Sequence, residues 1–178
     1  MDIFTAIETR RSHGLVTQDP VSKEQIEAIL QMACWAPTHK RTEPWEFHVF
    51  EGAGRKKLAD AIAIESGEDG AKKVYRAPVV IAVVAKPGRA ANNPPVWEDH
   101  AAVAAALQNM ALATHGLGLA GFWRSGKFCE QAAVKELLGV DTSKDDLIMG
   151  FFYVGHPDPA QPTPLRPEPK WEKKTVWY

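Results

Sequence analysis

The sequence predicts an α+β fold in a single domain that spans residues 1–178. Segments with helical periodicity alternate with segments typical of buried strands, but the strands are few and the connections between them are uneven in length. This pattern favours an α+β fold over a doubly wound parallel sheet. The length suits one domain with a substantial core and is short for two domains.

The first third of the chain contains two predicted helices and one strand. Asp2 can cap a short amphipathic helix that ends at a cluster of basic residues. Ser22 is a suitable N-cap for a second helix, because Gln25 stands at the reciprocal position of a capping box and Pro37 ends the helical pattern. The segment WEFHVF at residues 45–50 alternates large apolar with polar residues, which predicts a half-buried strand.

The middle of the chain predicts a helix, a buried strand and a second, apolar helix. We expect a helix from Arg55 to about Ile64 and then a polar loop over 66–73. The β-branched run APVVIAVVA at 77–85 is expected to form the central strand, followed by a loop over 86–99 that is rich in Pro, Gly and Asn. The helix predicted over 100–116 is apolar nearly all round, which indicates a position in the middle of the structure or at an interface.

Two further strands and a short helix are predicted after the apolar helix. The segment LAGFWRSG at 119–126 reads as a short strand, a helix is expected near 130–138, and DLIMGFFYVG at 146–155 predicts another buried strand. Gly116, Gly118 and Gly121 form a GxGxxG pattern that follows a helix and precedes a strand. This is the reverse of the dinucleotide-binding order, so the pattern does not indicate a Rossmann fold.

The segment over about residues 157–178 is rich in proline and cannot fold compactly alone. Its last residues, KKTVWY, alternate as a strand does, so we expect an extended C-terminal arm that ends in an edge strand and could lie on another subunit. The alternative is a tail without fixed structure, which would leave Trp171, Trp177 and Tyr178 in solvent.

The composition argues against several classes of protein. A formal net charge of −1 leaves no basic surface for nucleic acid, so any anion site must be local. The longest apolar run, at 77–85, is far below the roughly 20 residues of a membrane helix, and the first residues lack the apolar run of a signal peptide. Cys34 and Cys129 have no CxxC spacing, which argues against a zinc site or a disulfide framework and fits a reducing compartment. We therefore expect a cytoplasmic protein without a metal.

Two clusters of basic and hydroxyl side chains stand out. Arg10, Arg11 and Ser12 combine a forked cation, a second charge and a hydroxyl, which suits a phosphate dianion. The alternative for this cluster is a solvated helix end, since cations there also favour the helix dipole.

The second cluster spans residues 39–42 and follows the expected end of a helix. Trp35 and Trp45 offer flat apolar surfaces beside it, so a phosphate and a planar ring could be bound together.

These motifs carry a resemblance to a known family. The stretch AIETRRSHGLVTQDPVSKEQIEAILQMACWAPTHKRTEPWEFHVF resembles the amino-terminal signature of the nitroreductase family, flavoproteins that carry FMN, and most closely its small NAD(P)H nitroreductase subgroup. The strand APVVIAVVAK, the segment LQNMALATHGLGLAG and the run GFWRSG follow in the expected order. The resemblance covers most of the chain except the tail.

The resemblance implies a nitroreductase-like fold: a mixed central sheet flanked by helices, in an intertwined homodimer with an exchanged C-terminal arm and FMN in two interface sites. It assigns no catalytic residue, because the chemistry takes place at the flavin N5. The cofactor-binding residues that it implies are Arg10, Arg11, Ser12, Trp35, His39, Trp123, Arg124 and Ser125.

In this family the first three of these hold the FMN phosphate and ribityl chain. Trp35 and His39 match positions that reach the cofactor, most simply from the neighbouring subunit, and Trp123 begins the WRSG contact. Arg124 and His39 are the candidates for donors near the ring's N1 and O2.

The sequence departs from the family pattern at several positions. Many relatives have Asn and Gln where this chain has His39 and Glu43, and the subgroup can place Arg where this chain has Trp35. Larger relatives use a basic residue near the carboxyl end for the phosphate, and four candidates stay open here: Arg166, Lys170, Lys173 and Lys174.

The function that the resemblance implies is two-electron reduction. NAD(P)H would give a hydride to FMN, and a nitroaromatic, quinone or related small-molecule acceptor would take the electrons in a ping-pong mechanism. Three alternatives stay open: a flavin dehydrogenase or dehalogenase of the same fold with a specific metabolite as substrate, a non-catalytic FMN-binding module, and a structural dimeric protein without flavin. His115 is assigned only a capping or helix-dipole role at this point.

Overall fold

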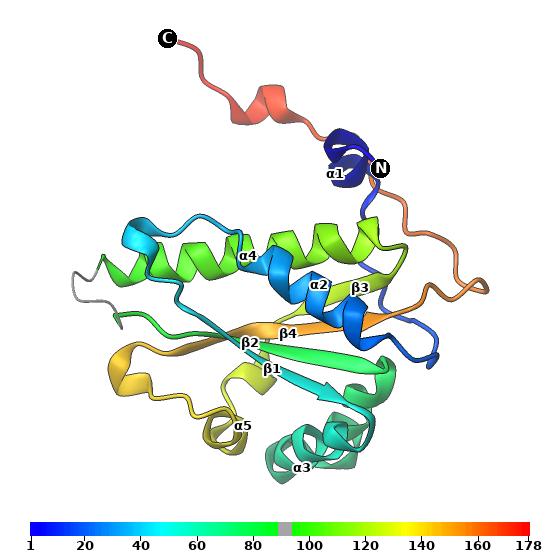
Figure 1. Ribbon diagram of the computed structural model, residues 1–178, viewed down its shortest axis with the longest axis vertical. Coiled ribbons are helices and arrows are strands. Elements are labelled where there is room, and N and C mark those ends of the chain that lie inside the picture. Colours follow the sequence, from blue (N-terminus) through cyan, green and yellow to red (C-terminus); the bar gives the residue numbers. More distant parts are fainter. Residues whose placement is uncertain (89–93) are drawn as a thin grey trace.

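The computed structural model describes residues 1–88 and 94–178, and its centre is a four-stranded sheet. The strands are β1 (Trp45–Glu51), β2 (Val79–Ala85), β3 (Ala120–Arg124) and β4 (Leu147–Gly155), in the order β1-β2-β4-β3 (Figure 1). The sequence placed all four strands correctly. The expected loop over 86–99 lies partly outside the described residues.

All three strand pairings in the described part of the chain are antiparallel, which corrects the expectation of a mixed sheet. A parallel pair would need a further strand at one of the sheet edges, and the segment expected to supply an edge strand does not pair in the single chain. Its residues form a 3-10 turn over Trp171–Lys174 and then continue unpaired.

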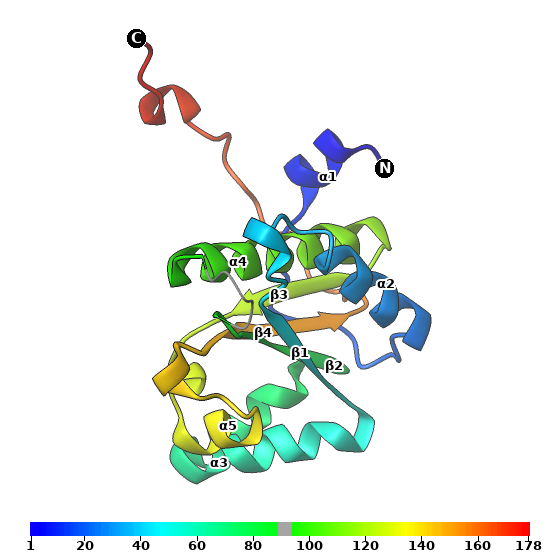
Figure 2. The same ribbon diagram turned by 60° about the vertical axis from the view of Figure 1, so that its left-hand side comes forward.

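Helices cover both faces of the sheet. On one face lie α2 (Lys23–Ala33) and α4 (Val96–Gly116), and on the other lie α3 (Arg55–Ala71) and α5 (Ala132–Leu137) (Figures 1 and 2). The layered arrangement confirms the α+β prediction. The short helix α1 (Ile3–Thr9) stands outside these layers, next to the C-terminal end of α4.

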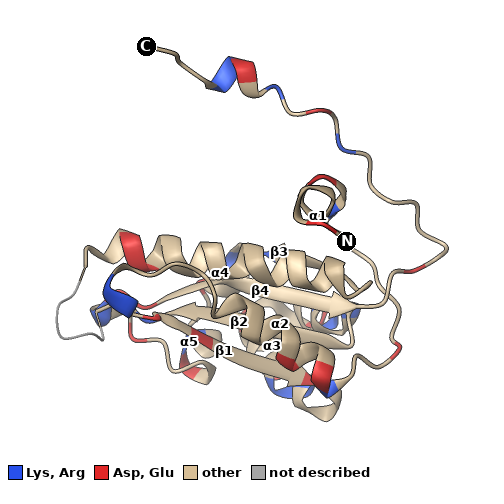
Figure 3. Cartoon of the chain, turned by 45° about the horizontal axis from the view of Figure 1, so that its top comes forward, with Lys and Arg blue, Asp and Glu red and all other residues tan. Residues whose placement is uncertain are grey.

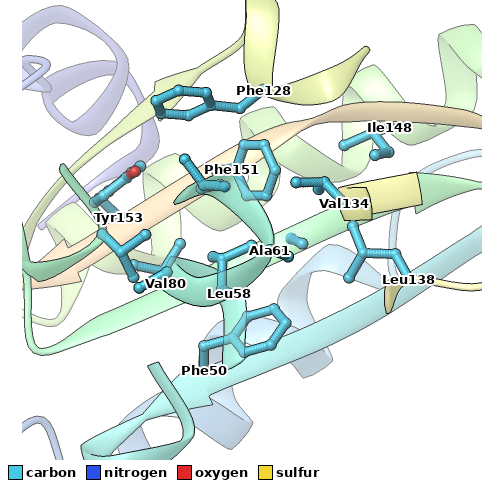
Figure 4. Packing of buried hydrophobic residues seen from close by; sticks show 14 of the residues in the cluster. Phe50, Leu58, Ala61, Val80, Phe128, Val134, Leu138, Ile148, Phe151 and Tyr153 are labelled. Atoms are coloured by element: carbon cyan, nitrogen blue, oxygen red, sulfur yellow. The ribbon is translucent and has the colours of Figure 1, made fainter. Parts of the chain in front are cut away.

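The central strand β2 divides the core in two. Every residue of β2 is buried, and alternate side chains point to opposite faces of the sheet. Val80, Ala82 and Val84 pack with α3 and α5, in the cluster that Figure 4 shows around Leu58, Val134 and Phe151. Val79, Ile81, Val83 and Ala85 pack with α2 and α4. Burial on both faces is the reason that this segment reads as a continuous apolar run.

The predicted caps are present. The Asp2 carboxylate accepts hydrogen bonds from the backbone N–H groups of Phe4 and Thr5, each at 3.1 Å. Ser22 and Gln25 form the complete capping box at the start of α2. These local contacts satisfy backbone donors that a helix start otherwise leaves unpaired.

The helix α3 is longer than predicted, and the polar loop expected over 66–73 is wrong. The helical segment extends to Ala71, but Gly67 interrupts it with φ 61° and ψ −171°, a non-helical conformation open to glycine that kinks the chain between two helical parts. After the bend, Gly70 packs against Ile62 and Ser66, where a Cβ atom would collide with the Ser66 side chain. The polar residues of this segment are the solvated face of a helix.

The C-terminal arm leaves the body beside α1 (Figures 1 and 2). Its first residues pair with the segment after α1 through an isolated bridge between Val16 and Pro157. The side chains from Pro159 onward are exposed. No helix in the described ranges has the length and hydropathy needed to cross a membrane.

Candidate functional site

A recess opens between the end of α1, the C-terminal half of α4 and strand β3. The space within it is about 630 Å³, part of which is open solvent at its mouth. One wall is basic and polar, and the other is apolar and aromatic. The lining residues are Arg10, Arg11, Ser12, His13, Leu107, Gln108, Ala111, Thr114, His115, Leu119, Gly121, Phe122, Trp123 and Phe152.

The segment after α1 is held at the mouth of this recess by backbone hydrogen bonds. The N–H of His13 donates to the carbonyl of Gly121 in β3 at 3.1 Å, and the N–H of Thr17 donates to the carbonyl of His156 at 2.9 Å. The first basic cluster therefore lies against the edge of the sheet. Four of the eight residues predicted to bind the cofactor line the recess, namely Arg10, Arg11, Ser12 and Trp123.

Arg10 carries an unsatisfied donor in this recess. Its Nε atom is buried and has no hydrogen-bond partner among the described residues. Burial lowers the pKa of Arg10, and the positive charges of Arg166 and Arg11 lower that pKa further. A buried donor among like charges is unfavourable in the free protein, and an anion would relieve both effects.

Arg11 links the recess to the C-terminal arm. Its Nη1 donates to the carbonyls of Glu8 at 2.6 Å and Arg10 at 3.0 Å, and its Nε donates to the carbonyl of Pro164 at 3.0 Å. This contact brings the arm to the basic end of the recess. Among the four basic candidates in the arm, Arg166 is the one whose charge acts on Arg10.

Trp123 forms a flat aromatic wall that is fixed in place. Its indole N–H donates to the carbonyl of Met149 at 2.8 Å, while 45% of the residue stays exposed. The register between β2 and β4 passes from Val83–Gly150 to Val84–Ile148, so Met149 is the extra residue of a β-bulge. The bulge provides the carbonyl that orients the indole ring.

The other four predicted residues lie outside the recess in the single chain. Arg124 is next to Trp123 in β3, and its guanidinium lies 5.4 Å from the ring centre of Phe128, in the core on the opposite face of the sheet. Ser125 is exposed after the strand. Trp35 lies at the end of α2 beside Leu112, in a separate apolar hollow.

His39 lines an open groove at the N-terminal end of α4. Its Nδ1 lies 2.6 Å from a carboxylate oxygen of Glu98, and Trp97 borders the same groove. The neighbouring residues Lys40, Arg41 and Glu43 all have positive φ angles, of 54°, 56° and 45°. Such conformations are uncommon for residues other than glycine and cluster at functional sites.

The sequence reasoning missed the contribution of α4 to the recess. Gln108, Ala111 and His115 lie three and four residues apart on one face of this helix, so both polar side chains point the same way. Gln108 and His115 are seven residues apart, about two helical turns, and this spacing on one face of the helix was the signal available in the sequence. His115 is therefore a wall of the recess as well as a residue of the last helical turn.

Metal binding has no structural support in the described ranges, where no group of three or more His, Cys, Asp or Glu side chains could hold an ion. Both cysteines are free, and burial raises the pKa of each thiol above its ordinary value. The chemistry that this recess supports is binding of an anionic group at one end and of an aromatic ring at the other.

Comparison with known proteins gives consistent matches over most of the chain. The family model described as "Nitroreductase family" matches residues 7–156. The Escherichia coli protein named "Putative NAD(P)H nitroreductase YdjA" is 33% identical over 179 residues, which cover 95% of this chain and 96% of that protein.

Solved structures match the chain as well, and two examples show the extent of the similarity. The nitroreductase-like family protein of Bacillus cereus has a TM-score of 0.85 at 28% identity, over 100% of this chain and 96% of that chain. A Desulfovibrio desulfuricans structure, described as a "putative nitroreductase in complex with fmn", has a TM-score of 0.76 at 31% identity, over 97% of this chain and 95% of that chain.

Proposed function

The chain belongs to the nitroreductase family, and from this premise we propose that it is an FMN-dependent oxidoreductase that uses NAD(P)H as electron donor. The observation that carries the proposal is the buried, unpaired Nε of Arg10 within a cluster of cations, opposite an oriented tryptophan. A phosphate would satisfy the donor and neutralise the cluster, and a flavin ring would pack against the aromatic wall. The residues of the recess therefore fit FMN.

Each side of the recess has a separate role in this proposal. Arg10 and Ser12 would bind the phosphate, with Arg11 held in place by backbone carbonyls beside them. Arg166 is our choice for the basic residue of the arm, because it is the candidate that acts electrostatically on Arg10. Trp123 would limit the position of the ring, since its own orientation is fixed by the Met149 carbonyl.

When bound, FMN would supply two-electron redox chemistry between NAD(P)H and a nitroaromatic, quinone or related acceptor. The protein supplies orientation and charge. Donor and acceptor would occupy the same open side of the recess in turn, which predicts ping-pong kinetics. We place this activity in the cytoplasm, because both cysteines are free thiols.

We further propose that a second copy of this chain completes the site. Trp35 and His39 would approach the ring from the partner, which is consistent with their distance from the recess of their own chain. The strained backbone at residues 40–43 supports a functional role for this segment. Arg124 and Ser125 stay candidates for cofactor contact only through rearrangement or the partner, since neither lines the recess.

The homodimer itself is supported by unpartnered apolar surface. Ile3, Met32 and Trp35 are 57%, 40% and 76% exposed and line one apolar hollow, and a contiguous exposed apolar patch marks an interaction surface. Figure 3 shows Asp and Glu on α4 only in its first turn and no Lys or Arg on this helix. The exchanged arm would cover part of this surface.

Deleting residues 171–178 is expected to weaken the dimer at least tenfold, because two tryptophans that each contribute roughly 1.5–3 kcal/mol on burial are lost. Sedimentation velocity over a concentration series measures the change in dissociation constant. The matched control is Ile64→Ser on α3, which is 75% exposed in the opposite layer and should leave association unchanged. An unchanged dimer after the deletion would show that the arm is a free tail.

The test of the proposed function is an anaerobic visible spectrum of the FMN-reconstituted protein, before and after NADPH and then NADH. Loss of the oxidised flavin bands on addition of either donor is the expected result. Flavin that binds and stays oxidised with both donors would favour a non-catalytic FMN-binding module. A protein that binds no FMN would refute the proposal, whatever its fold.

A further inference from the structure

We propose that His115 is a further cofactor-binding residue, and that it takes up a proton when the phosphate of FMN binds. The inference rests on the proposed function and extends it to a residue and a proton that the family resemblance does not assign. It follows from the hydrogen bonds of His115, from the charges around it and from its place in the wall of the recess.

The orientation of the His115 ring is determined by a threonine. The hydroxyl of Thr9 donates its single hydrogen to the carbonyl of Thr5 at 2.6 Å, since a carbonyl can only accept. The same hydroxyl lies 2.8 Å from the Nε2 of His115, so it must accept a hydrogen there. The Nε2 of His115 is therefore protonated in both charge states of the ring, and Nδ1 is the atom that can gain or lose a proton.

The surroundings of His115 disfavour its protonated form in the free protein. Burial lowers the pKa of this imidazole, and the charges of Arg10, His13 and Arg11 lower it further. Arg10, His13 and Arg11 face the imidazole from the segment after α1. On the helix of His115 itself, the neighbouring lining residues Gln108 and Thr114 are uncharged. The residues of β3 that line the recess are apolar. The described lining of the recess contains no carboxylate that would oppose them.

A bound phosphate dianion would reverse this balance. Its charge offsets those of the two arginines, so the pKa of His115 rises and Nδ1 gains a proton from the solvent. The protonated ring can then donate through Nδ1 while Nε2 stays bonded to Thr9. His115 would thus become a cationic donor of the anion site only after the anion is present.

The expected consequence is a pH-dependent affinity with a defined sign. The pKa of free His115 is lowered, and a bound phosphate would raise it, so binding would take up a proton at pH values between the two pKa values. The contribution of His115 to FMN affinity is then present at about pH 6 and declines as the pH rises. The variant His115→Gln should bind FMN roughly tenfold more weakly at about pH 6 and nearly as well as the wild type at about pH 9.

The experiment is calorimetric titration of the wild-type apoprotein with FMN near neutral pH, in two buffers of different ionisation enthalpy, which counts the protons taken up. His115→Gln and His115→Asn should both take up fewer protons than the wild type. His48→Gln is the matched control, because His48 pairs with Glu46 on β1, outside the lining of the recess, and should behave as the wild type. Riboflavin, which lacks the phosphate, should produce no uptake.

Each contrary result has a distinct meaning. Equal proton uptake in the wild type and in both His115 variants overturns the inference and leaves the proposed function intact. Proton uptake that disappears in His13→Gln but persists in the His115 variants would assign the proton to His13 and would also overturn the inference. Failure of the wild type to bind FMN at all would refute the proposed function itself.

Discussion

Replacing Arg10 by alanine is expected to weaken FMN binding roughly 30- to 1000-fold, which corresponds to about 2–4 kcal/mol. The guanidinium has a buried Nε without a partner among the described residues, and Arg166 and Arg11 add positive charge around it. A phosphate that binds here would receive charge-assisted hydrogen bonds in a partly desolvated site, where such bonds are strong. Quenching of flavin fluorescence during titration of the apoprotein measures the loss.

The controls for this prediction separate the phosphate from the ring. Arg76→Ala removes an exposed arginine that does not line the recess, and it should leave FMN affinity unchanged. Arg10→Lys keeps the charge but loses the planar fork, so an intermediate affinity is expected. Riboflavin should bind the wild type and Arg10→Ala about equally. A similar loss for FMN and riboflavin would mean that Arg10 does not act through the phosphate.

The substitution Arg10→Ala should not destabilise the FMN-free protein. In the absence of a ligand, the Arg10 side chain leaves a buried donor unsatisfied among other cations, and its removal eliminates that unfavourable arrangement. We expect an unchanged or slightly raised melting temperature for Arg10→Ala. A site that is unfavourable when empty and satisfied when filled is what a binding role predicts.

Most elements of the fold could be predicted because their signals are local. The capping box of Ser22 and Gln25 depends on residues three apart, and the central strand at 79–85 depends on a run of β-branched residues. The antiparallel direction of the three described strand pairs could not be obtained in this way, since strand direction depends on pairing between distant segments. The helical part of α3 after the kink at Gly67 was missed because its glycines and polar residues are also typical of a loop.

The sequence could predict the part of the candidate site that a single chain forms. Arg10 and Trp123 are more than a hundred residues apart, and their meeting in one recess agrees with the motif resemblance. Strand periodicity could have shown that Arg124 and Trp123 do not face the same recess, since consecutive side chains in a strand point to opposite faces of the sheet. Trp35 and His39 require a second subunit in our proposal, and no pattern within the sequence fixes that arrangement.

Replacing Gly150 by alanine is expected to destabilise the fold by about 3–5 kcal/mol, because two unfavourable effects add. Gly150 has a φ angle of 144°, a conformation that residues with a Cβ atom rarely adopt. A Cβ at this position would also collide with the indole nitrogen of Trp123 and lie 2.7 Å from its Cδ1 and 2.8 Å from the carbonyl oxygen of Arg124. The backbone of the bulge and the aromatic wall cannot both keep their positions.

Urea unfolding followed by far-ultraviolet circular dichroism measures the loss of stability, with Gly54→Ala as the matched control. Gly54 has a φ angle of −61°, and a Cβ added there would meet no heavy atom within 4 Å, so alanine should be tolerated. The bulge also orients the indole through the Met149 carbonyl, so the folded fraction of Gly150→Ala should bind FMN more weakly and show altered tryptophan emission. A loss below about 1 kcal/mol with unchanged emission would mean that the bulge relaxes freely and does not hold Trp123 in place.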